Sequence, residues 1–275
     1  SLVAANTTGT TREAKLCAAQ VSLQHETVQQ QVEHEEQEDD RTDSQLHAAV
    51  SYGYVGDDHV KLLLTNGADP NSRDKNGGRT ALHIAASGAY FAGMELLLDA
   101  GADPNVEDDD GNSAMHHACM GGCGKYAVDV VMYLHQTGGS NIGQANHDGD
   151  TPLHLASAIG DTACVEYLLQ VGTHPEGPAN IRGETPAHLA AGMGHMRVIE
   201  MVTDYGADVD ALDSENRTPY DVAVSSGKLW CSERIAELPR RKSTTKITDV
   251  GMEIGIISES RDAGASQSVG EGRGR

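Results

Sequence analysis

The stretch DGDTPLHLASAIGD, residues 148–161, decides the fold of this chain. Thr151 is a residue type that favours the N-cap of a helix, because its hydroxyl can accept a hydrogen bond from a first-turn N–H. Pro152 suits the first helical position, where no N–H is needed and φ is already helical. Gly160 suits the left-handed residue that ends a helix. The stretch therefore predicts a short helix that begins after Thr151 and ends before Gly160.

Versions of this stretch recur along the chain. The Thr or Ser that begins each version stands at 44, 80, 113, 151, 185 and 218, so the spacings are 36, 33, 38, 34 and 33 residues. A His follows three residues later in every version except the last. A period near 33 residues indicates a stacked array, in which each unit packs on its neighbours.

The residues that follow each version predict a second helix and then a turn. ACVEYLLQVG, residues 163–172, has apolar residues at helical spacing and ends in Gly172. Gly-Ala-Asp-Pro-Asn follows the second helix at 67–71 and 101–105, and DDDGN at 108–112 has the composition of a hairpin tip. One unit is therefore expected to be helix, turn, helix and projecting hairpin.

These motifs resemble those of the ankyrin repeat family. The resemblance covers six units between residues 43 and 238, and it rests on Thr-Pro-Leu-His, on Leu-Leu-Leu at 62–64 and 96–98, and on Gly-Ala-Asp at 67, 101 and 206. It implies an all-α solenoid of helix-turn-helix units with projecting β-hairpin loops, flanked by extended tails. The third unit departs most from the pattern, because extra residues surround GGCGKYAVD at 121–129. Such inserts are expected at exposed edges.

The composition is strongly acidic. The formal net charge is −21, and residues 43–238 contain 28 acidic and 10 basic residues. Such a segment repels phosphate backbones, so no nucleic acid partner is predicted, and a protein partner with a basic surface is favoured. No apolar stretch is long enough to span a membrane. Five scattered Cys residues favour a reducing, intracellular compartment, either the cytoplasm or the interior of an organelle.

The segment HHACMGGC contains four residue types that bind zinc. His116, His117, Cys119 and Cys123 could hold the ion, but His116 and Cys119 fall on repeat positions that the family uses for interunit bonding and for the core. Cys164 is likewise expected in the core. The acidic run 108–110 lacks the downstream Glu of a calcium loop. We therefore predict no metal, no cofactor and no catalytic residue.

The ends of the first helices are the predicted binding surface. In the family, residues before the terminal Gly of the first helix face a concave groove. Here the middle positions are Met120, Ile159 and Met193, which predict an apolar centre. Acidic residues at the hairpin tips are expected to form a charged rim around it: Asp109, Asp110, Asp148, Asp150 and Glu184.

The two ends of the chain differ from the repeats. Residues 1–42 are acidic, rich in Gln and Glu, and could form a helix; the start lacks Met, so we expect a removed leader or a trimmed sequence. Residues 239–275 begin with PRRKSTTK, where Ser243 resembles a kinase site, and end rich in Gly and Ser. The tail alternates apolar and other residues as a strand would, at Val250, Met252, Ile254 and Ile256.

These observations favour a non-catalytic scaffold for protein–protein interaction. We expect an accessory or structural subunit of a larger assembly, in which the tails contact neighbouring subunits. A regulatory adaptor that captures a basic, partly apolar peptide and is controlled near Ser243 remains an alternative. The chain could also be the ankyrin part of a larger enzyme or channel.

Overall fold

The computed structural model describes residues 41–51, 57–121 and 124–239. Over these ranges the chain is helical, and the loops between helices are turns that contain no strand. The all-α repeat fold is confirmed, whereas the projecting loops are closed by turns rather than by β-ladders. The chain divides into the compact units Ser1–Arg240 and Arg241–Arg275, and the second lies outside the described residues.

Six helix pairs follow one another along the chain. A helix at 41–51 and α2 (Asp57–Thr65) form unit 1. Units 2 to 4 are α3 (Ala81–Ser87) with α4 (Phe91–Asp99), α5 (Ala114–Cys119) with α6 (Ala127–Gln136), and α7 (Pro152–Ile159) with α8 (Thr162–Gln170). Units 5 and 6 are α9 (Pro186–Met193) with α10 (Met196–Asp204), and α11 (Pro219–Ser225) with α12 (Leu229–Glu237).

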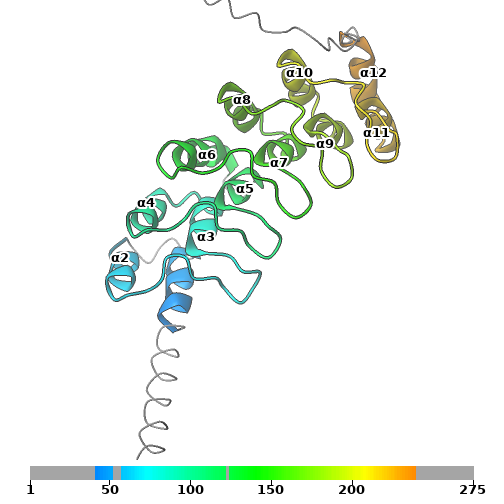
Figure 1. The fold of residues 1–275 in the computed structure, drawn as a ribbon. Helices are drawn as coiled ribbons and strands as arrows, with labels where there is room; N and C mark the ends of the chain where they lie inside the picture. Colours follow the sequence, from blue (N-terminus) through cyan, green and yellow to red (C-terminus); the bar gives the residue numbers. More distant parts are fainter. Residues whose placement is uncertain (1–40, 52–56, 122–123, 240–275) are drawn as a thin grey trace, which may run out of the picture. The chain divides into compact units, whose positions relative to one another are not determined.

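The helices form two rows (Figure 1). The first helices α3, α5, α7, α9 and α11 pack on one another in sequence order, and the second helices α2, α4, α6, α8, α10 and α12 form the other row. Small and aliphatic residues fill the space between the rows; Ala85, Ala118, Ala156 and Ala190 are fully buried in consecutive units. These small side chains allow the short helices to approach closely, which explains why so few aromatic residues are needed.

The first helices α7 and α9 begin and end as the sequence predicts. Thr151 has extended backbone and forms a capping box with His154, and Pro152 occupies the first helical turn of α7. Gly160 ends that helix in the left-handed region with φ 83°, and Gly194 ends α9 with φ 85°. In unit 3 the short helix η1 (Gly124–Tyr126) lies between α5 and α6, where the sequence has its largest insert.

Both predicted tails lie outside the described residues, apart from 41–42 and residue 239. This applies to Ser243, to the alternating residues Val250, Met252, Ile254 and Ile256, and to the acidic segment at 1–40. The interpretations placed on them remain predictions.

Candidate protein-binding surface

Buried histidines connect successive units near the start of each first helix. The His154 ring is fully buried, its Nδ1 accepts the Thr151 N–H at 3.2 Å, and its Nε2 lies 3.2 Å from the carbonyl oxygen of Glu184 in the next unit. The same arrangement recurs at three further histidines, each bonded to the Thr or Ser at its own N-cap and to a carbonyl of the following loop: His83, His116 and His188.

These contacts fix the protonation state of the rings. A carbonyl oxygen only accepts and a backbone N–H only donates, so Nε2 must carry the proton and Nδ1 must be bare. Burial lowers the pKa of His83 to about 4, and the neighbouring His117 acts in the same direction. Burial also lowers the pKa of His116, His154 and His188. The four rings are therefore neutral connectors rather than candidate acids or bases.

The sixth unit shows why histidine is used in the others. Its corresponding residue is Asp221, whose Oδ2 accepts the Thr218 N–H at 2.9 Å. No described unit follows the sixth, so no carbonyl of a further loop has to be bonded. An acceptor-only carboxylate is sufficient there, whereas an internal unit requires one acceptor and one donor on the same side chain.

Three apolar side chains are exposed at the opposite ends of the first helices. Met120 directly follows α5, Ile159 is the last residue of α7 and Met193 is the last residue of α9; they are 38, 50 and 60 % exposed. A Cβ placed on Gly121, the residue after Met120, would lie 3.5 Å from Ile159, so the helix ends of units 3 and 4 approach each other closely. We call these three residues the apolar row.

The projecting loops are held to one another by a ladder of single backbone hydrogen bonds. The N–H groups of Asp109, His147, Ile181 and Ser214 donate to carbonyls of the preceding loop, at 2.9 to 3.0 Å. Asp109, Asp110 and Asp148 are exposed on these loops. We call these three carboxylates the acidic tips.

Asp150 and Glu184 are not part of the exposed rim, and their prediction as tip residues was wrong. Each is only 8 % exposed. The Asn180 side-chain amide donates to Asp150 Oδ1 at 2.9 Å and to Glu184 Oε2 at 3.3 Å, and Asn180 Oδ1 accepts the Glu184 N–H at 2.9 Å. The Glu184 carboxylate therefore closes its own loop, and the Asp150 carboxylate joins its loop to the next, which makes both carboxylates structural.

The first projecting loop has the opposite charge to the next. Residues 72–79 include Arg73, Lys75 and Arg79 against one acidic residue, whereas residues 106–112 include four acidic and no basic residues. The Arg73 guanidinium lies 2.8 Å from the Asp109 carboxylate, so the two loops are joined where the charge changes sign.

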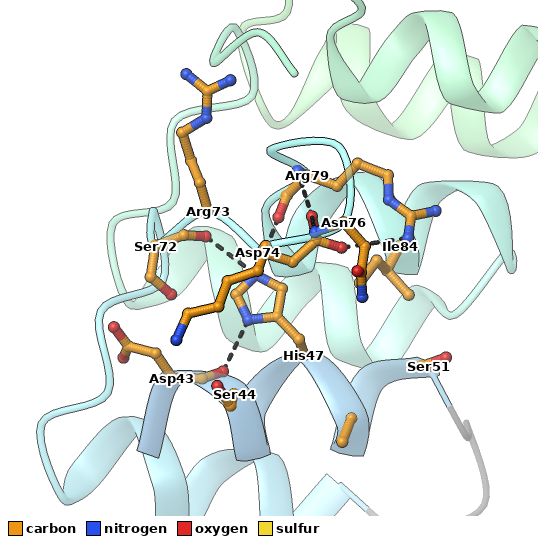
Figure 2. Close-up of a pocket in the computed structure, with 12 residues that line it drawn as sticks. Asp43, Ser44, His47, Ser51, Ser72, Arg73, Asp74, Asn76, Arg79 and Ile84 are labelled. Atoms are coloured by element: carbon orange, nitrogen blue, oxygen red, sulfur yellow. Dashed lines mark hydrogen bonds and ion pairs between the residues drawn. The ribbon is translucent and has the colours of Figure 1, made fainter. Parts of the chain in front are cut away.

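A pocket of about 410 Å³ lies between this first loop and the helix at 41–51 (Figure 2). His47 lies beneath the loop, with Nδ1 2.7 Å from the Asp43 carbonyl oxygen and Nε2 3.0 Å from the Arg79 carbonyl oxygen. Both carbonyl oxygens only accept hydrogen bonds, and a neutral imidazole carries a single N–H. A neutral His47 ring can therefore donate to just one of them. His47 therefore differs from the four other connecting histidines.

Sequence reasoning missed an exposed apolar residue on the loops. Ile181 is 70 % exposed, and its N–H is bonded to the carbonyl oxygen of Asp148, which is one of the acidic tips. Its position in the sequence, one residue after Asn180, could have identified Ile181 as a residue of the projecting loop. Leu229 and Trp230 are also exposed, on α12 of the last unit.

The residues of the HHACMGGC segment that the structure describes have roles other than zinc binding. His117 Nε2 lies 2.7 Å from Asp108 Oδ2, and His116 belongs to the connecting histidines. Cys119 and Cys164 are buried, as expected for core residues, and the neighbouring Cys119 thiol together with burial raises the pKa of Cys164. Within the described ranges no group of His, Cys, Asp and Glu has a metal-binding arrangement; Cys123 lies outside them.

Stacked helix pairs joined by buried histidines and projecting loops define a solenoid built from repeats. The model of the family described as Ankyrin repeats (3 copies) matches residues 15–108 and 89–177, and the model described as Ankyrin repeat matches residues 182–214. The chain belongs to the ankyrin repeat family. No curated protein matches it.

Family membership indicates the general kind of function. Ankyrin repeats mediate protein–protein interaction and are typically non-catalytic, so the chain has protein partners. The sixth unit lies beyond the matched residues but has the same helix pair and the same Thr-Pro start. Among the described residues, no helix is both long and apolar enough to cross a membrane.

Proposed function

We propose that this chain is a non-catalytic scaffold, an accessory or structural subunit of a larger assembly that binds partners through its first helices and loops. The observation that carries the proposal is the apolar row. Met120, Ile159 and Met193 are exposed in three successive units, at positions that do not pack the stack. Scattered exposed apolar residues are common, whereas exposed apolar residues at the same helix end in three successive units are typical of an interface.

The partner chemistry follows from the charges on the projecting loops, at the other end of the first helices. The acidic tips Asp109, Asp110 and Asp148 favour Lys or Arg on the partner. Each first helix begins at its projecting loop and ends at the row, and the eight residues of α7 span about 12 Å. A partner that contacts both zones must therefore present an apolar centre and a basic edge about one helix length apart.

Purification from the native source, with mass spectrometry of the co-eluting proteins, tests the assembly role. A stable complex of fixed stoichiometry is expected. A monomeric chain with only substoichiometric partners would instead favour the regulatory adaptor and contradict the subunit proposal.

Neutralising the acidic tips tests the partner chemistry. With the identified partner, Asp109→Asn, Asp110→Asn and Asp148→Asn together should lower the association rate constant and weaken its dependence on salt. The matched control changes three exposed acidic residues on the second helices, Glu95→Gln, Glu166→Gln and Asp204→Asn. Equal effects of the two triple changes would show that only the net charge matters.

A further inference from the structure

The units are also connected by side chains at the start of the loops. In unit 1 the Asn71 carboxamide bridges to unit 2, because its Oδ1 accepts the Asp103 N–H at 2.7 Å and its Nδ2 donates to the Gly101 carbonyl at 3.1 Å. In unit 2 the Asn105 Oδ1 accepts the Asn141 N–H at 2.7 Å. We call each such side chain a bridging residue.

The bridging residue can be located in every loop by a local turn. It stands four residues after the left-handed Gly that follows the second helix, and its own N–H is bonded to the side chain two positions earlier, as Asn71 is to Asp69 and Asn105 is to Asp103. In unit 4 this residue is Glu176, whose Oε1 accepts the Asp208 N–H at 3.1 Å.

In unit 3 the same position is Gly143. Its N–H is bonded to Asn141 Oδ1 at 3.1 Å, so the local turn is intact, but glycine has no side chain to reach unit 4. The groups that a bridging residue would bond are the N–H of His174 and the carbonyl of Gly172, which correspond to Asp103 and Gly101 at the junction of units 1 and 2.

A pocket of about 450 Å³ lies at this junction. His174, Gly172 and Gly143 line it, so the groups left without a bridging residue border the open space. Its apolar lining includes Ile142 and Leu153. The pocket has neither a carboxylate nor a Lys or Arg side chain in its lining, although the repeat region as a whole is acidic.

We propose that this pocket binds a primary carboxamide, the Asn or Gln side chain of a protein partner, which takes the place of the missing bridging residue. A carboxamide oxygen accepts from the His174 N–H while its NH₂ donates to the Gly172 carbonyl, as Asn71 does at the first junction. A carboxylate can make only the first of these two bonds, as Glu176 does at the junction of units 4 and 5, because it has no donor for the Gly172 carbonyl, and the acidic repeats repel it. The site is independent of the apolar row.

The chain tolerates a side chain at position 143. The φ of Gly143 is not left-handed, and an added Cβ would meet only Asn141 Oδ1, at 3.8 Å. Gly143→Asn should therefore supply the bridging residue internally, fill the pocket, raise Tm by a few degrees and exclude the external carboxamide. Gly143→Ala is the matched control, because it restricts the unfolded chain without adding a carboxamide.

The test is an NMR titration of the full chain with N-acetyl-L-asparagine methylamide, using the aspartate analogue for comparison. We expect a saturable shift of the His174 amide at millimolar compound, at least about tenfold weaker binding of the aspartate analogue, unchanged binding by Gly143→Ala and loss of binding by Gly143→Asn. The proposal is overturned by the absence of a saturable His174 shift in the wild-type chain, or by an equal shift in Gly143→Asn. It is also overturned by equal affinity for the two compounds.

Discussion

The two ends of the first helices differ in what they contact. At the N-terminal ends, the connecting histidines and the N-cap Thr or Ser residues are buried and repeat the same bonds from unit to unit. At the C-terminal ends, the residues vary between Ser, Met, Ile and Gly, and the apolar row is exposed. The N-terminal end of each first helix therefore holds the stack together, and the C-terminal end is free to differ between units.

Removing one connecting histidine should have the largest effect. His154→Ala leaves the Thr151 N–H and the Glu184 carbonyl without their partner and opens a cavity in a fully buried site. We expect the free energy of unfolding to fall by about 3 kcal/mol, measured by urea denaturation. The matched control His147→Ala removes an exposed loop histidine and should cost less than about 0.5 kcal/mol. Similar losses for the two variants would contradict the connecting role.

Lowering the pH should destabilise the N-terminal ends of the first helices, where the connecting histidines lie. The pKa of His83 is lowered to about 4 in the folded chain, whereas an unfolded chain binds the proton near pH 6.5. The contribution of His83 is therefore complete above pH 6.5 and is lost as the pH falls from 6.5 to 4, amounting to about 2 kcal/mol at pH 5.

Urea denaturation at pH 7 and pH 5, together with NMR titration of the histidine rings, checks this prediction. The lowered pKa values of His116, His154 and His188 should add to the loss, because all four rings resist protonation in the folded state. If the His83 ring titrated near pH 6.5 in the folded chain, the folded state would not require the neutral form of this histidine.

Removing an N-cap hydroxyl should have a smaller effect. Thr151→Ala should lower the free energy of unfolding by about 1 kcal/mol, because the hydroxyl and His154 form the capping box of α7. In the matched control Thr162→Ala, the helix start is already capped by the side chain of Asp161, so the change should be less than about 0.5 kcal/mol. An unchanged urea midpoint in Thr151→Ala would show that the hydroxyl does not stabilise the helix start.

Much of the fold was predictable because it depends on local chemistry. Thr-Pro at 151–152 and Gly160 determine where a helix begins and ends, and the period of the pattern predicts the stacking. The apolar row was also placed correctly on the surface, since its register follows from the helix ends.

The parts that failed depend on contacts that form only when the loops fold and stack. Asp150 and Glu184 look like tip residues until the loops fold back and their carboxylates meet Asn180. Gly143 looks unremarkable as a sequence position, because the missing side chain is noticed only beside the bridging residues Asn71, Asn105 and Glu176 of three other junctions. Ile181 was overlooked because an apolar residue in a polar loop gives no periodic signal.

The most direct test of the central claim measures the affinity for an identified partner and Tm on the same variants. Met120→Ser, Ile159→Ser and Met193→Ser together should raise Kd at least about tenfold while Tm changes by no more than about 2 °C, because these side chains do not pack the stack. The control triple, Leu62→Ser, Tyr205→Ser and Leu229→Ser, removes exposed apolar residues elsewhere and should leave both quantities nearly unchanged. An unchanged Kd in the first triple variant, or a large fall in its Tm, would contradict the account.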